Sequence, residues 1–235
     1  MCRMIAFASA EPLDATPYLA RLADFSRNGN LVEGWEKRSG GNHPDGWGIA
    51  YLQGGEIRVL RSGKPACADP LLGETRVRTD RFLGHVRYAS NTATVNAVNA
   101  HPFLAPGAAL AHNGTFRGTV GEEADARGVS DTLVFLERLA DRWRERTLPS
   151  LREALSGMLG DPGLVGDYSA ANLLIASGDA LFALRKYRRN ESYYTLFLRA
   201  TPGRVEAASE PLDDAPGWEP MGNGLLVELD PRAPR

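Results

Sequence analysis

The first residues of the chain form a short apolar run that begins directly after a cysteine. Residues 2–10 read Cys2-Arg3-Met4-Ile5-Ala6-Phe7-Ala8-Ser9-Ala10, and Glu11-Pro12 follow them. An apolar run of this length, bounded by a charged residue and a proline, is typical of a buried β-strand. It is too short, and its basic region is too small, for a secretion signal. We therefore expect an N-terminal strand with Cys2 at its start, and a cytoplasmic protein.

The composition is that of a soluble globular protein. The 235 residues are 43% hydrophobic and 24% charged, close to the average for a folded protein. Because no linker or low-complexity break divides them, we expect a single domain over residues 1–235. With 27 basic and 29 acidic residues, the net charge of −2 argues against nucleic acid as a partner. No apolar run approaches the ~18 residues of a membrane span, so we expect no membrane partner either. The two cysteines and four scattered histidines predict neither a disulfide framework nor a metal site, and we expect no cofactor.

The pattern of apolar residues predicts helices and strands that occur in blocks. Helices are expected from Thr16-Pro17 to Phe25, near 69–77, from Ser130 to Trp143 and over 149–159. Strands are expected over 47–52, 57–60, 82–89, 108–111, 170–177, 180–186, 193–200, 204–209 and 224–229. Because strands and helices do not alternate strictly, an α+β fold is favoured over a doubly wound parallel sheet. The long loops 28–45 and 90–107 are candidates for function.

Cys2 has a chemical possibility that an internal cysteine lacks. A small second residue permits removal of Met1, and the new α-amine then lies on the cysteine itself. Such an amine has a pKa of about 7.7–8.0, so it can accept the proton of its own thiol near neutral pH. Nucleophile and base then belong to one residue. A small residue at position 2 is also common without any catalytic role.

Six short motifs accompany Cys2 in a fixed order. They are Cys2-Arg3, Asn42-x-Pro44-Asp45-Gly46-Trp47-Gly48-Ile49-Ala50, Gly84-His85-Val86-Arg87-Tyr88-Ala89-Ser90, Asn99-Ala100-His101-Pro102-Phe103, Ala111-His112-Asn113-Gly114 and Ser130-Asp131-Thr132. Together they resemble the class II glutamine amidotransferases, a branch of the N-terminal nucleophile hydrolases. The resemblance covers Cys2 to about residue 135. It implies a four-layer αββα sandwich, in which two antiparallel sheets are flanked by helices.

The resemblance assigns the catalytic roles to three residues. Cys2 corresponds to the nucleophile, and Asn113 and Gly114 correspond to the oxyanion-hole pair. The Asn113 amide and the Gly114 N–H would then stabilise the developing negative charge on the substrate oxygen. On local sequence alone, Asn113-Gly114 is instead typical of a type I′ turn.

Five further residues correspond to the substrate-binding part of the family site. Arg87 matches the residue that binds the α-carboxylate of glutamine, Ser90 a hydroxyl near it, and Asp131 the carboxylate that binds the α-ammonium group. Asp131 is equally suited to the first turn of a helix capped by Ser130. Gly46 and Trp47 belong to a segment of the small, free-standing members, although a hairpin strand explains them as well. His43, His101 and His112 lie beside these motifs, and we interpret them as structural.

The resemblance implies an enzyme that hydrolyses the γ-amide of glutamine, or of a γ-glutamyl conjugate, through a γ-glutamyl thioester. No ammonia-using domain is expected before the chain stops at Arg235. Ammonia would then pass to a separate synthetase subunit, or the enzyme would release an amine from a γ-glutamyl small molecule. The alternative is a non-catalytic subunit that binds an amino acid and regulates a synthetase. Such a binder would need neither Cys2 nor Asn113.

Overall fold

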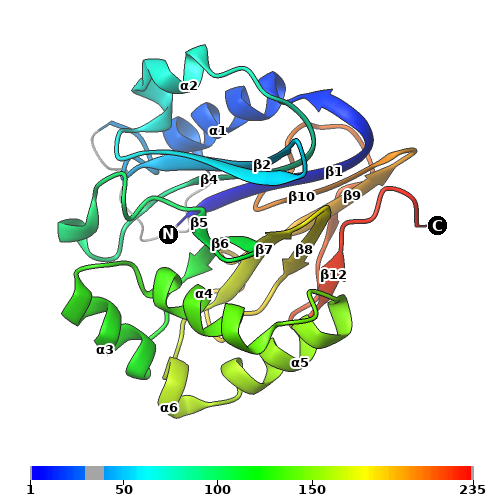
Figure 1. Ribbon diagram of the computed structural model, residues 1–235. Coiled ribbons are helices and arrows are strands. Elements are labelled where there is room, and N and C mark those ends of the chain that lie inside the picture. The colour runs from blue at the N-terminus through cyan, green and yellow to red at the C-terminus, as the bar shows by residue number, and fades with distance from the viewer. Residues whose placement is uncertain (1, 30–39, 234–235) are drawn as a thin grey trace.

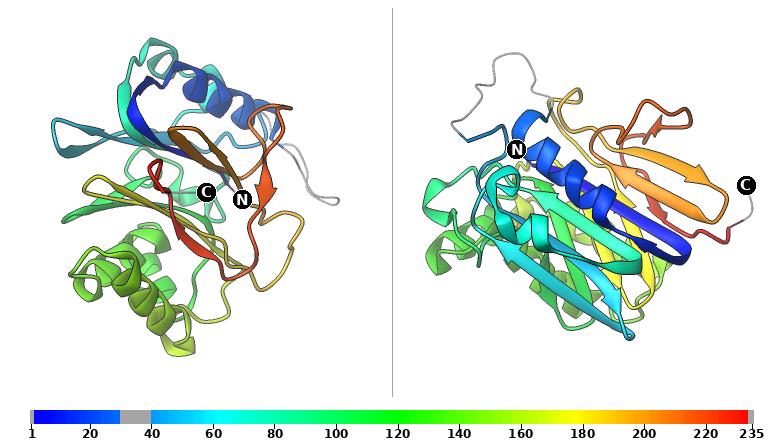
Figure 2. Two further views of the ribbon diagram at one scale, coloured as in Figure 1. Left: turned by 90° about the vertical axis from the view of Figure 1, so that its right-hand side faces the viewer. Right: turned by 90° about the horizontal axis from the view of Figure 1, so that it is seen from above.

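Two antiparallel sheets are stacked face to face, and helices cover the outer face of each (Figure 1). The computed structural model describes residues 2–29 and 40–233. Viewed from the side, the four layers follow one another as helices, sheet, sheet and helices (Figure 2). The predicted αββα sandwich is therefore confirmed.

The larger sheet has seven strands and the smaller has five. In spatial order, the larger sheet contains β11 (Glu219–Pro220), β9 (Phe197–Thr201), β10 (Arg204–Ala208), β1 (Arg3–Asp14), β4 (Arg78–Val86), β2 (Trp47–Gln53) and β3 (Glu56–Ser62). The smaller sheet contains β12 (Leu226–Glu228), β8 (Ala180–Leu184), β7 (Ala171–Ser177), β6 (Ala108–Gly114) and β5 (Phe103–Ala105).

The helices fall into two groups along the chain. The larger sheet is covered by α1 (Thr16–Asn28) and α2 (Pro70–Glu74), with a short 3-10 turn η1 (Ala66–Ala68) between them in space. The smaller sheet is covered by α3 (Gly118–Arg127), α4 (Asp131–Arg142), α5 (Leu148–Leu159) and α6 (Pro162–Val165). A second 3-10 turn, η2 (Thr92–Thr94), lies in the long connection between β4 and β5. No helix in the described residues is both long and apolar enough to cross a membrane.

Alternate residues of β1 face different layers of the core. Ile5 and Phe7 pack toward α1, whereas Met4, Ala6 and Ala8 belong to the cluster between the sheets. This is the two-residue period of a strand that is buried on both faces. Because the inner residues are mostly small, the two sheets pack closely, and the strand that follows Cys2 is fixed from both sides.

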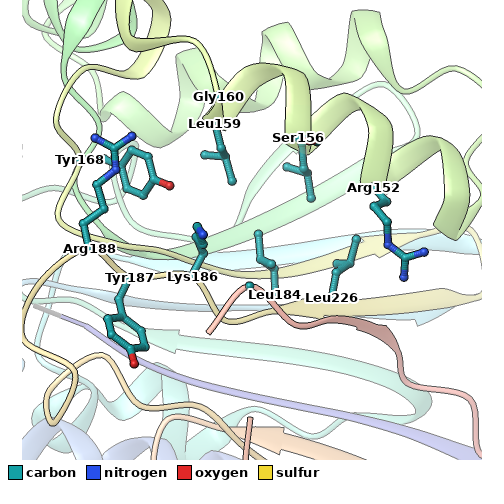
Figure 3. A pocket seen from close by; sticks show the side chains of 12 residues that line it. Arg152, Ser156, Leu159, Gly160, Tyr168, Leu184, Lys186, Tyr187, Arg188 and Leu226 are labelled. Carbon is teal, nitrogen blue, oxygen red and sulfur yellow. The ribbon is translucent and has the colours of Figure 1, made fainter. Parts of the chain in front are cut away.

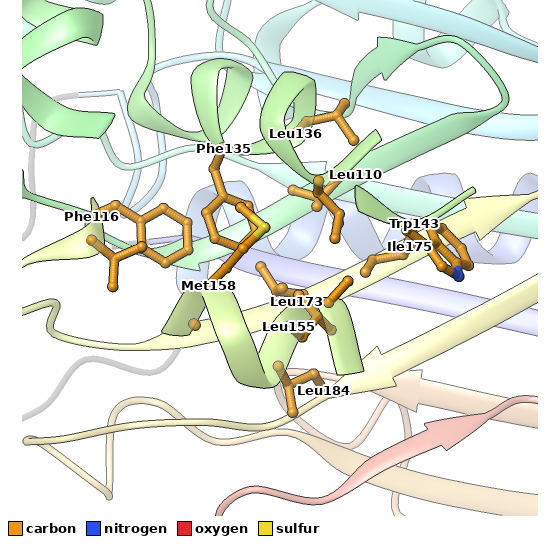
Figure 4. Packing of buried hydrophobic residues seen from close by; sticks show 14 of the residues in the cluster. Leu110, Phe116, Phe135, Leu136, Trp143, Leu155, Met158, Leu173, Ile175 and Leu184 are labelled. Atoms are coloured by element: carbon orange, nitrogen blue, oxygen red, sulfur yellow. The ribbon is translucent and has the colours of Figure 1, made fainter. Parts of the chain in front are cut away.

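The largest apolar cluster lies under the second group of helices. Phe135 of α4 and Leu155 of α5 pack over Leu110 and Leu173, which belong to β6 and β7 (Figure 4). This packing holds the start of α4 against the strand that ends in Asn113-Gly114.

Most predicted elements are found, but several bounds differ, and neither β5, which lies in the predicted loop 90–107, nor α6 was predicted. The helix α3 was not predicted, because it contains two glycines and buries only Val120 and Ala124. The strand expected over 82–89 is β4, which ends at Val86, and that over 193–200 begins only at Phe197. Of the predicted loop 28–45, residues 30–39 lie outside the described residues.

Candidate active site

Cys2 lies where the two sheets meet, directly before the first residue of β1. Its side chain is buried, and its backbone nitrogen donates a hydrogen bond to Oδ1 of Asn113 over 3.0 Å. Its sulfur lies 3.8 Å from the carbonyl oxygen of Tyr88, which follows β4. Arg3 donates from its guanidinium to the Cys2 carbonyl and pairs with Glu210. These contacts fix the backbone on both sides of the thiol.

The side chain of Cys2 is a neutral thiol rather than a thiolate near neutral pH. Burial raises the pKa of Cys2 above its ordinary value, and the positive charge of Arg87 opposes this shift only in part. A thiol with a raised pKa carries little negative charge at neutral pH and needs a proton acceptor before it can attack a carbonyl carbon.

Asn113 and Gly114 form the end of a strand. They pair with Asn172 and Ala171 of β7 in regular antiparallel register, so the type I′ turn alternative is wrong. The Nδ2 atom of Asn113 is buried and has no hydrogen-bond partner among the described residues. A buried amide donor without a partner costs free energy, on the order of 1–3 kcal/mol. This donor is therefore suited to an acceptor that arrives with a ligand.

Gly114 can only be glycine in this backbone. A Cβ atom at this position would lie 1.9 Å from the carbonyl oxygen of Ala170 and 2.5 Å from Nε2 of His112. Because both neighbours belong to the buried core around β7 and α4, neither can move aside at low cost. The strand end therefore approaches the neighbouring segment more closely than any side chain allows.

Arg87 is buried beside the thiol. Its guanidinium donates to the carbonyl oxygen of Thr94, and over 2.7 Å to Oγ1 of the same residue. Its backbone nitrogen donates to the carbonyl oxygen of Gly46 over 2.8 Å. Burial lowers the pKa of the guanidinium, and the charges of Cys2, Asp45 and Asp131 oppose that shift. An arginine remains cationic in such a setting.

Asp45 fixes the segment that carries Arg87. Its carboxylate accepts from the backbone nitrogen of Ala89 over 2.7 Å, and its own nitrogen donates to the carbonyl oxygen of Arg87 over 3.1 Å. Neither Asp45 nor Thr94 was singled out from the sequence. The one available signal was their position, because Asp45 lies within a quoted motif and Thr94 within the loop 90–107.

Asp131 and Ser90 line the same cavity as Arg87. The volume of this space, which we call the Arg87 cavity, is about 320 Å³, and Thr94 also contributes to its wall. Asp131 accepts from the backbone nitrogen of Phe116 over 2.6 Å and from that of Thr132 over 2.9 Å. It thus begins α4 and faces the cavity at once, so a capping role and a binding role are compatible.

A second cavity continues from the first. This Arg189 cavity has a volume of about 280 Å³, and its inner wall contains Tyr88 and Gly114. Ser90, Thr115 and Arg117 line both cavities. The two therefore form one cleft, which passes Gly114 at the end of β6.

The structure does not bring Trp47 into this cleft. Its side chain is fully buried in the cluster under α1, where Nε1 donates to Oδ2 of Asp69 over 3.0 Å. Gly46 contributes through its backbone, at a φ of 117°, by accepting from Arg87. The predicted contact of Gly46 and Trp47 with substrate therefore concerns their backbone atoms, and it stays a prediction.

Three of the histidines, His85, His101 and His112, are buried around the end of β6. His112 contacts Oγ1 of Thr132 over 2.9 Å and the Ala170 carbonyl over 3.0 Å. The ring of His101 lies 4.4 Å from that of His85, and neither of its nitrogens has a hydrogen-bond partner among the described residues. Burial lowers the pKa of all three, so they are neutral near pH 7. Within residues 2–29 and 40–233, no group of His, Cys, Asp or Glu is arranged to hold a metal ion.

A larger cavity lies elsewhere, between α5 and the edge of the smaller sheet (Figure 3). Its volume is about 470 Å³, and its walls contain Arg152, Leu159, Lys186 and Arg188. It contains none of the predicted site residues, and the chemistry of the cleft does not reach it.

Comparison with known proteins identifies the family. Residues 25–206 match the model of the class-II glutamine amidotransferases. The chain belongs to this family. The prediction of an enzyme that acts on γ-glutamyl amides is thereby confirmed at the level of the family.

Two curated relatives of this amidotransferase domain differ in how much of their length it covers. It is 28% identical over 236 residues to the γ-glutamyl-hercynylcysteine sulfoxide hydrolase of Mycolicibacterium smegmatis, a match that covers 97% of this chain and 96% of that protein. It is 30% identical over 180 residues to an uncharacterized protein of Methanocaldococcus jannaschii. That match covers 72% of this chain but only 50% of the relative.

Solved structures show the same fold. A glutamine aminotransferase class-II domain protein from Silicibacter pomeroyi superposes with a TM-score of 0.63 at 19% identity, over 97% of this chain and 94% of that one. The glutamine phosphoribosylpyrophosphate amidotransferase of B. subtilis gives 0.62 at 19% identity, over 97% of this chain and 47% of that one. Their agreement over 97% of this chain confirms the predicted fold.

Proposed function

We propose that this protein hydrolyses the γ-amide of glutamine or of a γ-glutamyl conjugate, with Cys2 as an N-terminal nucleophile once Met1 is removed. The observation that carries the proposal is the contact of Cys2 with Asn113. The Cys2 nitrogen donates a hydrogen bond to Oδ1 of Asn113. The buried Nδ2 atom of the same amide has no hydrogen-bond partner among the described residues. This arrangement supports a site in which the nucleophile, the base and an oxyanion donor belong to one hydrogen-bonded unit.

The first step is a proton transfer within Cys2. Burial raises the pKa of the thiol, so the α-amine is needed as the acceptor of its proton. The resulting ammonium group donates to Oδ1 of Asn113, which holds the positive charge beside the thiolate. The thiolate then attacks the γ-carbonyl carbon of the substrate.

The attack places negative charge on the substrate oxygen. Nδ2 of Asn113 and the N–H of Gly114 donate to this oxygen, and donors fixed in a buried site stabilise it without reorganisation. The tetrahedral intermediate collapses when its C–N bond breaks and the α-ammonium group of Cys2 protonates the departing amine. Water then attacks the γ-glutamyl thioester, which releases glutamate and restores the thiol.

The Arg87 cavity binds the amino-acid end of the substrate. Two of the guanidinium donors of Arg87 are engaged by Thr94, and the remaining N–H groups bind the α-carboxylate. Asp131 lies on the same cavity and accepts from the α-ammonium group, with Ser90 beside them. This charge pairing rejects substrates that lack a free amino-acid head group.

The substrate is glutamine or a γ-glutamyl small molecule. The end-to-end similarity to a γ-glutamyl-hercynylcysteine sulfoxide hydrolase supports an amine other than ammonia as a leaving group. A synthetase subunit that accepts ammonia, and the cytoplasmic location, stay predictions.

Glutamate release by the purified, Met1-processed protein tests the proposal. Glutamine and a set of γ-glutamyl amides are the substrates, and Cys2→Ala is compared with Cys67→Ala, which removes a half-buried cysteine outside the cleft. We expect Cys2→Ala to abolish release and Cys67→Ala to retain it. Full activity of Cys2→Ala would contradict the proposal, and amino-acid binding without turnover by the unaltered protein would indicate the regulatory alternative.

A further inference from the structure

The Arg189 cavity and the Arg87 cavity share part of their walls but differ in the residues that line each of them alone. Arg87 and Asp131 line only the Arg87 cavity, whereas Tyr88 and Gly114 line only the Arg189 cavity. This inference rests on the proposed function. A substrate with its head group at Arg87 and its γ-carbonyl at Gly114 must extend its leaving amine into the Arg189 cavity.

The walls of this cavity carry more positive than negative charge. Asp167 pairs with Arg189, and it is shared with Arg188 over 3.5 Å. Arg117 lines the cavity as well and has no ion-pair partner within residues 2–29 and 40–233. Two guanidinium groups and one carboxylate therefore line the cavity, and the Arg189 pair holds the pKa of Asp167 below its usual value, so that it remains ionised.

Hydroxyl groups at the back of the cavity add hydrogen-bond donors. The buried Tyr194 donates to Oγ of Ser169 over 2.8 Å, and both residues line the cavity. Because Oγ of Ser169 accepts this bond, its own proton is directed to another acceptor. Guanidinium and hydroxyl donors that converge on one space are suited to a carboxylate.

We propose that the protein acts on γ-glutamyl amides whose leaving amine carries an anionic group, with a γ-glutamyl amino acid as the simplest case. Arg189 is the main specificity residue. Both Arg188 and Arg189 form ion pairs with Asp167, but of these two only Arg189 lines the cleft. The sulfur of Cys2 bonds to the γ-carbonyl carbon, the bond from that carbon to nitrogen breaks, and the amine takes a proton from the Cys2 ammonium group and leaves as a free amino acid. Water then hydrolyses the γ-glutamyl thioester, which releases glutamate and restores the thiol.

Arg188 provides a matched control. It is the neighbour of Arg189 and pairs with the same carboxylate, but it lines the other cavity, where its guanidinium lies 4.2 Å from the ring centre of Tyr168 (Figure 3). Substituting either arginine removes the same charge from the same region of the protein. Only the substitution of Arg189 removes a positive charge from the cavity that the leaving amine enters.

The test compares γ-glutamylglycine with γ-glutamylglycinamide, which differ in the charge of the leaving amine, and includes glutamine. Values of kcat/KM are measured for the full-length protein and for Arg189→Gln and Arg188→Gln. We expect Arg189→Gln to lower kcat/KM for γ-glutamylglycine about tenfold and to change that for the other two substrates less than about twofold. Arg188→Gln should leave all three within about twofold.

Three results would overturn the inference. These are an equal loss by Arg189→Gln on the charged and neutral substrates, no loss on either, or an equal selective loss by Arg188→Gln. In each of them, hydrolysis of glutamine or γ-glutamylglycinamide by the unaltered protein leaves the proposed function standing. Failure to hydrolyse any of the three substrates overturns the proposed function, and the inference falls with it.

Discussion

The backbone nitrogen of Cys2 and the Oδ1 atom of Asn113 are joined by a hydrogen bond of 3.0 Å. This bond links the start of β1 in the larger sheet to the end of β6 in the smaller one. Because Oδ1 is engaged, the amide nitrogen of Asn113 faces away from the Cys2 backbone, and it is buried with no partner among the described residues. In the proposed mechanism, this contact positions the nucleophile and orients an oxyanion donor.

The first prediction concerns this donor. Asn113→Ala should lower kcat about 10²- to 10³-fold and change KM little, because the lost interaction forms mainly in the transition state. Steady-state kinetics of glutamate release measure both constants. The control is Asn172→Ala, which removes an equally buried amide from the paired position of β7. An equal fall of kcat in both variants would show that Asn113 acts only through the fold.

The second prediction concerns the planar guanidinium group of Arg87. Arg87→Lys keeps the charge but loses the planar set of donors that contacts Thr94 and the head group, so kcat/KM should fall about tenfold or more. The matched control is Arg81→Lys, a buried arginine of β4 that contacts backbone carbonyls of Ser9 and Asp179 instead. That variant should lose stability and keep its KM. Unchanged kinetics of Arg87→Lys would exclude Arg87 as the head-group ligand.

The third prediction concerns Trp47. Trp47→Phe leaves the carboxylate of Asp69 without its indole donor, and should lower the free energy of unfolding by about 1–3 kcal/mol. Because the side chain lies outside the cleft, kcat/KM of the folded variant should stay within about twofold of the unaltered protein. Urea denaturation and kinetics on the same preparation check both statements. A raised KM with unchanged stability would place Trp47 against the substrate.

The fourth prediction concerns acid stability. Burial holds the pKa of His85 and of His101 well below 6.5, so the unfolded chain binds more protons than the folded one as pH falls through 6.5. Stability is therefore fully present above pH 6.5, and below it each histidine removes up to about 1.4 kcal/mol per pH unit. Urea denaturation between pH 7.5 and 5 (a range of about 2.5 units) measures the slope.

His101→Gln provides the control for this effect. Its slope should be smaller by up to about one proton, which is the contribution of a single histidine. Carboxylates with lowered pKa values, such as Asp69 and Asp213, lose their contribution only at more acidic pH. Equal slopes for the variant and the unaltered protein would show that His101 is protonated while the protein is folded.

The sequence predicted those parts of the site that depend on local pattern or on the motif order. The alternation of apolar residues after Cys2 marked a buried strand, and the motifs placed Arg87 and Asp131 in one site. The Asn113-Gly114 pair is a turn signal when it is considered alone. It becomes a strand end because β7 pairs with it, and β7 lies about 60 residues later in the chain.

Other parts of the site could not be predicted from local sequence. Thr94 acts through its backbone carbonyl and its hydroxyl, and no residue pattern shows that Arg87 will reach them. Trp47 precedes a glycine at the start of a hairpin strand, and the sequence does not show which face of the sheet it will occupy. Asp69 decides this, because its carboxylate accepts the indole N–H under α1. Such choices depend on partners that are distant in sequence.

The most direct test is mass spectrometry of the full-length protein after reaction with a glutamine-like diazoketone, with peptide mapping of the product. The account predicts a chain that lacks Met1 and carries one adduct, located on the N-terminal peptide at the sulfur of Cys2. Cys67 should remain unmodified, and Cys67→Ala should react as the unaltered protein does. An active protein that retains Met1, or that carries its adduct at a residue other than Cys2, would contradict the N-terminal cysteine mechanism.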